Sequence, residues 1–259
     1  MSEVVKSYLR SLELPPIPSI AIHQGVADET TAVFDAAKNQ AQVVGGSLFS
    51  FVQGVTPEVR TAISNSALLA QLVANKKYSA EANPLDWYRV YNEVLHNVGW
   101  VIQTGEWNKY EGKGTIAEVH QQLIEVLGAA ITGGPAAALI KSAIDALTKI
   151  QKDQANGSWL RIFSRETQKA RISRFQVGLA EPGADADVFI TLLCCVINAS
   201  KTVTEVLVFK FKAENADFTA NLGKVSVNKD SIEAIGPAIR QKVLDYQTAY
   251  LSSIKDLAV

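Results

Sequence analysis

The stretch Asp187–Asn198 (DVFITLLCCVIN) constrains the fold more than any other part of this sequence. It is continuously apolar and rich in β-branched residues over the length of one strand. Both sets of alternating side chains are apolar except for Thr191, whereas a strand with one face in solvent alternates with polar residues. We therefore expect a central strand that is covered on both faces, in a sheet that needs helices packed against it.

The rest of the sequence supplies helical patterns before this strand and alternating patterns around it. Helices are expected over 3–14, 28–44, 56–74, 83–102, 115–131 and 135–153. After Lys169 the pattern alternates, with Phe175, Val177 and Leu179 on one face of a strand. A third strand is expected at Thr202–Lys212, a weaker fourth at Phe218–Val227, and a terminal helix from Asp230.

This layout predicts an α+β fold, because the helices and strands are segregated along the chain and do not alternate. The helix-rich N-terminal two-thirds would pack on a C-terminal antiparallel β-meander of three to four strands, closed by a C-terminal helix. No linker-like stretch separates the two parts. We expect a single domain over 1–259, with a mainly helical part at 1–168 and the meander plus the terminal helix at 169–259.

Composition excludes several classes of partner. A net charge of −1 with 47% hydrophobic residues describes an ordinary globular protein and gives no basic field for nucleic acid.

The first sixteen residues have interleaved charges and lack the uninterrupted apolar segment of an export signal. We therefore expect a protein that is cytoplasmic when synthesised, with export by a non-Sec route left open.

The two cysteines, Cys194 and Cys195, are adjacent within the expected central strand. Neighbouring strand residues point to opposite faces, so a disulfide between them would be strained and we predict free thiols. Core filling is the ordinary role of such residues, and an apolar setting disfavours a nucleophilic thiolate. The same setting would bury the methylenes of an attached acyl chain at roughly 0.8 kcal/mol each. Cys194 is preferred for that role, because the other side chains on its face of the strand are all aliphatic. Those on the face of Cys195 include Thr191.

No catalytic or metal-binding residue is assigned, and we expect a protein that is not an enzyme. The three histidines, His23, His96 and His120, are not at the spacing of metal ligands, and no nucleophile or zinc motif is present. An enzyme of unrecognised class remains an alternative. Its residues would come from His96, His120 or Asp185 around a cleft.

Three segments carry a resemblance to a known family: NPLDWYRVYNEV, GEWNKYEGKGTIAEV and TLLCCVIN. They resemble the bacterial virulence factor family typified by the Erwinia virulence factor, which includes accessory proteins encoded beside α-helical pore-forming toxins. The resemblance implies an α/β fold and a buried cysteine that carries a palmitoyl thioester, at Cys194 or Cys195. It implies no other cofactor. The implied partners are a fatty acyl chain and toxin components or a host membrane, and the oligomeric state is left open.

A second alternative is a component of an α-helical pore-forming toxin, whose helical hairpin Gln121–Lys141 leaves the soluble fold and inserts. The apolar run Val126–Ile140 is shorter than the roughly 17–25 residues of a membrane span and is broken by Gly133-Gly134-Pro135. Glu125 also lies inside the hairpin. These features favour two packed soluble helices over an inserting pair.

Overall fold

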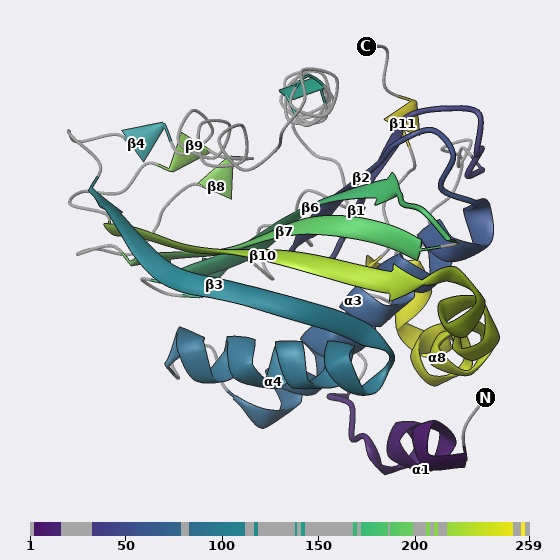
Figure 1. Cartoon of the computed structure of the whole chain (residues 1–259). Coiled ribbons are helices and arrows are strands. Elements are labelled where there is room, and N and C mark those ends of the chain that lie inside the picture. Colours follow the sequence, from purple (N-terminus) through teal and green to yellow (C-terminus); the bar gives the residue numbers. More distant parts are fainter. Residues whose placement is uncertain are drawn as a thin grey trace.

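The computed structural model describes residues 3–16, 33–78, 83–111, 117–118, 138, 141–142, 168–169, 172–185, 187–198, 206–207, 210–211, 217–250 and 255–256. Its helices are α1 (Glu3–Ser11), α3 (Pro57–Lys77), α4 (Pro84–Asn97) and α8 (Lys229–Tyr250) (Figure 1). Its long strands are β3 (Trp100–Glu111), β6 (Ile172–Pro182), β7 (Asp187–Asn198) and β10 (Asp217–Asn228), with β1 (Gln40–Val44) and β2 (Ser47–Phe51) shorter. Two-residue strands are β4 (Ala117–Glu118), β5 (Gln168–Lys169), β8 (Val206–Leu207), β9 (Lys210–Phe211) and β11 (Lys255–Asp256).

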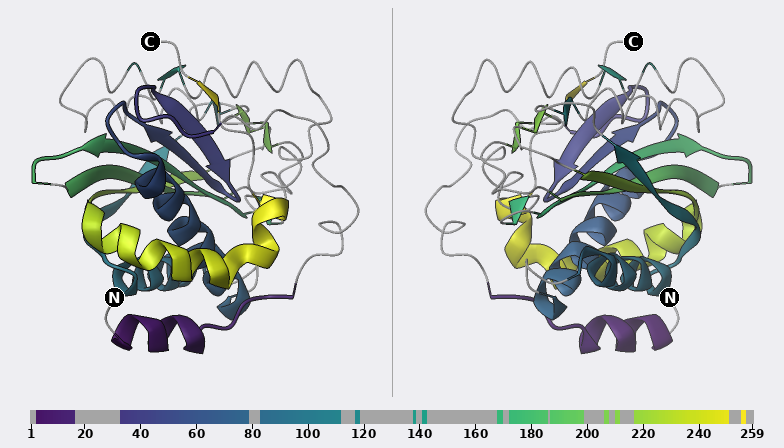
Figure 2. Two further views of the ribbon diagram at one scale, coloured as in Figure 1. Left: turned by 90° about the vertical axis from the view of Figure 1, so that its right-hand side faces the viewer. Right: turned by 90° about the vertical axis from the view of Figure 1, so that its left-hand side faces the viewer.

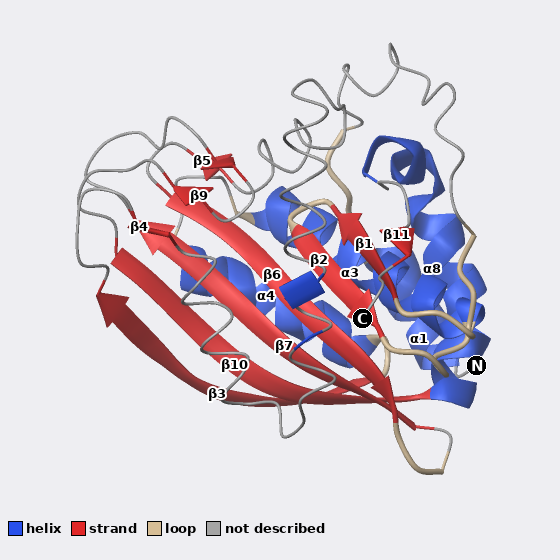
Figure 3. Ribbon diagram, turned by 90° about the horizontal axis from the view of Figure 1, so that it is seen from above, coloured by secondary structure: helices blue, strands red, loops and turns tan. Residues whose placement is uncertain are grey.

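The main sheet has the strand order β11-β1-β2-β6-β7-β10-β3, with β5 paired to β6 (Figure 3). Its pairs are antiparallel except for β2 and β6, which run parallel. Strand β7 pairs with β6 on one side and with β10 on the other along its whole length. The predicted central strand, Asp187–Asn198, is therefore confirmed with its bounds.

The α+β class is confirmed, but the predicted order of helices and strands is wrong. Strands β1, β2 and β3 come from the first part of the chain, so the sheet is not a C-terminal meander. The neighbour of β7 is β10, whereas the described parts of Thr202–Lys212 form β8 and β9 in a separate sheet with β4. Thr202–Lys212 has the stronger alternation, but it does not lie beside β7, because tertiary packing outweighs intrinsic strand propensity.

The helix expected over 28–44 is also wrong. Residues Gln40–Val44 form β1, which pairs with β2 across a tight turn. Gly45 has a φ of 54° in that turn, a left-handed conformation that glycine adopts without steric cost. Alanine and glutamine favour a helix locally, but pairing with β2 satisfies the backbone groups of this segment instead.

Two further expectations have different outcomes. The helix expected over 83–102 is confirmed only as far as Asn97, where α4 ends, and the chain from Trp100 onward forms the edge strand β3. The helix expected at 115–131 contains β4 near its start, so it does not begin at Thr115. The rest of that helix, and the 135–153 helix apart from helical positions 138 and 141–142, lies outside the described residues.

Helices α3, α4 and α8 cover one face of the sheet (Figure 1). Helix α1 lies outside this layer, against α8 (Figure 2). The predicted starts at Thr56 and Asn83 are confirmed, because their side chains accept hydrogen bonds from the backbone N–H groups of Val59 and Leu85. None of the described helices is long and apolar enough to cross a membrane.

Helix α3 lies at the centre of the molecule and is buried on nearly all sides. Polar side chains on one of its faces bind the edge hairpin. Ser64 Oγ donates to Gln42 Oε1 at 2.7 Å, and Gln71 Nε2 donates to the carbonyl of Val44 at 3.1 Å. Buried polar groups are tolerated when they are paired in this way, so the contact between α3 and β1 is specific as well as close.

Arg60 makes the densest of these contacts. Its guanidinium donates to the carbonyls of Val55, Lys38 and Val52 at 2.8, 2.9 and 3.1 Å, and to Gln40 Oε1 at 2.7 Å. The rings of Phe34 and Phe51 also lie within 6 Å of it, at 5.9 and 5.6 Å. Burial lowers the pKa of Arg60 to about 10, against the opposing effect of Asp35, so the side chain stays charged at neutral pH.

Replacing Arg60 should destabilise the fold strongly. Arg60→Leu removes the donor from three backbone carbonyls and from Gln40, and we expect the free energy of unfolding to fall by about 3–5 kcal/mol. Urea denaturation measures the change. Arg89→Leu is the matched control, because Arg89 is exposed on α4 and should cost no more than about 0.5 kcal/mol. Equal effects of the two substitutions would contradict a central role for Arg60.

Candidate functional site: the paired thiols of β7

The two cysteines occupy the middle of the central strand and are both free and buried, which confirms the predicted thiols. Cys194 belongs to the core beneath the helices, together with Val188, Ile190, Leu192 and Val196. Cys195 points to the opposite face, as the alternation of a strand requires. The sheet therefore separates two adjacent thiols into different surroundings.

Cys194 has polar neighbours across the sheet. Directly opposite it are Gln176 on β6 and Asn221 on β10, and both are buried. Tyr88 and Tyr91 of α4 lie close enough that a charge on Cys194 would raise the pKa of either hydroxyl. The neighbours along the strand are aliphatic as predicted, but the neighbours across it are two amides.

A chain of buried hydrogen bonds occupies this side of the sheet. Gln71 Nε2 donates to Ser47 Oγ at 3.0 Å, and Ser47 donates to Gln176 Oε1 at 2.8 Å. Gln176 Nε2 in turn donates to the hydroxyl of Tyr88 at 2.9 Å. That hydroxyl lies 2.9 Å from the carbonyl oxygen of Cys195 and 3.0 Å from that of Phe175. A chain of paired polar groups therefore reaches Gln176, which lies opposite Cys194 on β6.

Cys195 has apolar neighbours. Phe175 on β6 and Ala220 on β10 lie directly opposite it, and both are buried. Leu193 and Ile197, on the same side of β7, are fully buried as well. The expected cover of both faces therefore holds at this part of the strand. The cover is incomplete at Phe189, which lies on the same face near the β6–β7 turn and is 51% exposed.

Burial controls the chemistry of both thiols. It raises the pKa of Cys194 to about 12, and it raises the pKa of Cys195 well above its ordinary value, with the charge of Cys194 adding to the effect. Burial also raises the pKa values of Tyr88 and Tyr91. A thiolate is the reactive form of cysteine, so neither residue is suited to nucleophilic catalysis in the folded protein.

The residues of the enzymatic alternative are only partly described. His96 is exposed in the last turn of α4, and Asp185 is exposed in the β6–β7 turn with a φ of 54°. His23 and His120 lie outside the described residues, so a convergence of histidine and carboxylate on one cleft is not tested. Within the described ranges no group of three or more potential ligands could hold a metal ion.

Sequence reasoning missed the contacts of Tyr88, Gln176 and Asn221 with the thiol region. Tyr88 appears in the sequence as one member of an amphipathic stripe, and nothing local indicates that its hydroxyl reaches the sheet. The sign in the sequence was Gln176, an amide on the face of the strand opposite Phe175 and Val177, next to a central strand that is apolar on both faces. An isolated polar residue in such a setting needs a buried partner.

The structure defines the class of this protein as an α+β fold with buried thiols at the centre of its sheet, and comparison with known proteins does not narrow that class further. No family model matches the chain, and no curated protein matches it. Among solved structures, a delta-endotoxin is 11% identical with a TM-score of 0.41, covering 85% of this chain and 91% of its own. The Evf virulence factor is 12% identical with a TM-score of 0.30, covering 96% and 91%. Both likenesses are distant, and neither carries an inference about what this chain does.

The raised pKa values predict a loss of stability at alkaline pH. An unfolded thiol ionises near pH 9, whereas the buried thiols stay protonated, so the unfolded state releases protons first and gains stability as the pH rises. Between pH 8 and pH 10 each thiol should lower the free energy of unfolding by about 1.4 kcal/mol. Urea denaturation at both pH values, on protein whose intact mass shows that both thiols are free, should show a smaller loss in the Cys194→Ala, Cys195→Ala double variant. An unchanged loss would show that neither thiol is protected.

Proposed function

We propose that this protein is a non-enzymatic accessory protein of a bacterial virulence or toxin system, and that it carries a palmitoyl group as a thioester on a core cysteine. The sequence resemblance to a family with such a cysteine supports the proposal. The single observation that carries it is the pair of free thiols, buried in the central strand with raised pKa values. Such thiols are poor nucleophiles, whereas a thioester in their place has no charge to desolvate.

We place the acyl chain on Cys195, although sequence alone favoured Cys194. The neighbours of each cysteine on the adjacent strands support this choice. The chain would leave Cys195 among Phe175, Ala220, Leu193 and Ile197, where each buried methylene stabilises by roughly 0.8 kcal/mol. At Cys194 it would have to displace the hydrogen-bonded groups around Gln176, and unpaired buried polar groups are costly.

The transfer step fits this burial only before the core closes. The cysteine sulfur attacks the carbonyl carbon of an acyl thioester donor, a new carbon–sulfur bond forms, and the donor thiol leaves with the cysteine proton. This step needs the thiolate, which the folded core disfavours. Acylation therefore accompanies folding, and the mature protein presents its outer surface to a toxin component or a host membrane.

Intact-mass measurement of protein from a bacterial host tests the proposal. We expect an addition of about 238 Da that neutral hydroxylamine removes, as for other thioester-linked palmitate. The addition should persist in Cys194→Ala and be absent from Cys195→Ala. The two variants are matched controls for each other, because each removes one buried thiol.

Three outcomes would contradict parts of the proposal. An unmodified wild-type mass would remove the acyl group. Loss of the added mass in Cys194→Ala alone would assign the acyl group to Cys194, on the helix-covered side of the sheet. Leakage of liposomes caused by the pure protein would contradict a purely accessory role and favour the pore-forming alternative.

A further inference from the structure

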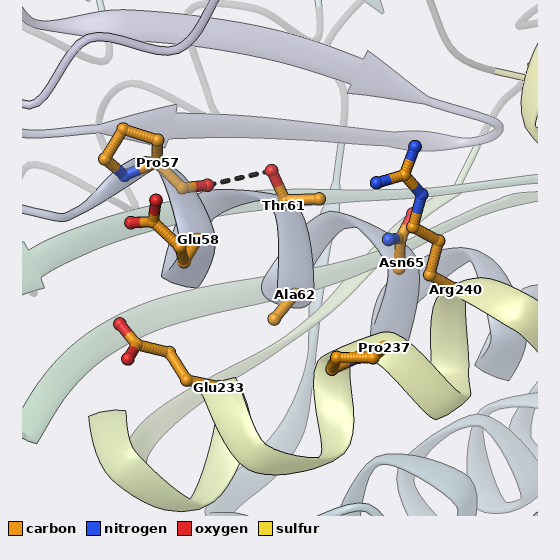
Figure 4. A pocket seen from close by; sticks show the side chains of 9 residues that line it. Pro57, Glu58, Thr61, Ala62, Asn65, Glu233, Pro237 and Arg240 are labelled. Carbon is orange, nitrogen blue, oxygen red and sulfur yellow. Dashed lines mark hydrogen bonds between the residues drawn. The ribbon is translucent and has the colours of Figure 1, made fainter.

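A pocket of about 330 Å³ lies between the first half of α3 and α8 (Figure 4). This size falls within the range of small-molecule sites. The pocket is separate from the thiols. Its lining residues are Pro57, Glu58, Thr61, Ala62, Asn65, Glu233, Gly236, Pro237 and Arg240.

The charges of the pocket are segregated by sign. Glu58 and Glu233 lie toward one end, and Asn65 and Arg240 lie toward the other (Figure 4). On each helix the two ends are seven residues apart, which is about 10 Å along the axis. Among the described residues no ion pair engages Glu58, Glu233 or Arg240. The pocket therefore offers a negative end and a positive end, whose backbone positions are about 10 Å apart along the helix axes.

The middle of the pocket is apolar, and the two helices approach each other closely there. Ala62 and Gly236 bring the two helices together, since a Cβ added at Gly236 would lie 3.3 Å from the Cβ of Ala62. Pro237 extends this apolar wall. Thr61 offers little polarity, because its hydroxyl already donates to the carbonyl of Pro57 at 2.8 Å.

The negative end has acceptors suited to an ammonium group. Glu233 Oε1 accepts a hydrogen bond from Thr56 Oγ1 at 3.2 Å, which orients that carboxylate. The carboxylates of Glu58 and Glu233 both line this end of the pocket, and together they can accept the three donors of an ammonium group.

We propose that this pocket binds a short peptide of about three residues with free termini. An extended chain rises 3.3–3.6 Å per residue, so three residues are about as long as the roughly 10 Å that separates the backbone positions of the two ends. The terminal ammonium of the peptide would bind at Glu58 and Glu233. Its terminal carboxylate would accept two parallel hydrogen bonds from the guanidinium of Arg240. Small apolar side chains fit the wall at Ala62 and Gly236.

Calorimetric titration with trialanine, to about 10 mM, tests the proposal. We expect wild-type protein to bind trialanine more tightly than N-acetyl-trialanine, trialanine amide or alanine. Arg240→Gln should weaken trialanine roughly two- to fivefold, as expected for exposed ion pairs, and leave trialanine amide unaffected. Glu233→Gln should weaken trialanine by a similar factor and leave N-acetyl-trialanine unaffected. Arg89→Gln and Glu93→Gln, which change exposed charges on α4, are the matched controls.

The pairing of variant with probe separates a specific site from general charge effects. No heat from trialanine would overturn the proposal. Equal weakening of all probes by Arg240→Gln, or equal weakening by the α4 controls, would also overturn it. The outcome is independent of acylation, because the intact mass of each sample is measured separately.

Discussion

The buried guanidinium of Arg60 holds the β1–β2 hairpin to the central helix α3. Its hydrogen bonds reach the backbone on both sides of the β1–β2 hairpin, at Lys38 and Val52. An arginine placed in an apolar core without such partners would be very costly, so the hairpin and α3 have to assemble together. The hairpin then provides β2, which continues the sheet onto β6 in parallel. The position of the edge of the sheet thus depends on one side chain of the central helix.

The hydrogen-bond chain from Gln71 to Tyr88 extends this arrangement to the middle of the sheet. It connects α3, the start of β2, β6 and α4 through buried side chains. Networks of this kind favour one arrangement because every alternative leaves a buried donor or acceptor unpaired. They also make the two faces of β7 unequal. Cys194 lies between two buried amides, and Cys195 lies between apolar residues, so the two thiols have different surroundings.

Sequence reasoning succeeded where one short-range rule dominated. Asp187–Asn198 was found because a run of strand length that is apolar on both faces is typical of a buried central strand. Helices α3 and α4 were found because Thr56-Pro57 and Asn83-Pro84 are strong helix starts. Sequence reasoning failed where pairing partners decide the structure. Gln40–Val44 has the composition of a helix but forms a strand. The strand expected at Phe218–Val227 was found, but its place beside β7 was not, because asparagine, glycine and lysine weaken its pattern. Both segments are strands because neighbouring strands satisfy their backbone groups.

The sequence by itself determined the α+β class, the central strand, the helix starts and the presence of two thiols that must face opposite ways. These properties follow from periodicity, capping chemistry and the alternation of a strand, which act over a few residues. Only the tertiary structure decided which strand lies beside β7, that Gln176 and Asn221 flank Cys194, and that Glu58 and Glu233 lie at the same end of one pocket. These properties depend on contacts between residues far apart in the chain. No local pattern records such contacts, because burial and hydrogen bonding across elements select them only when the whole core assembles.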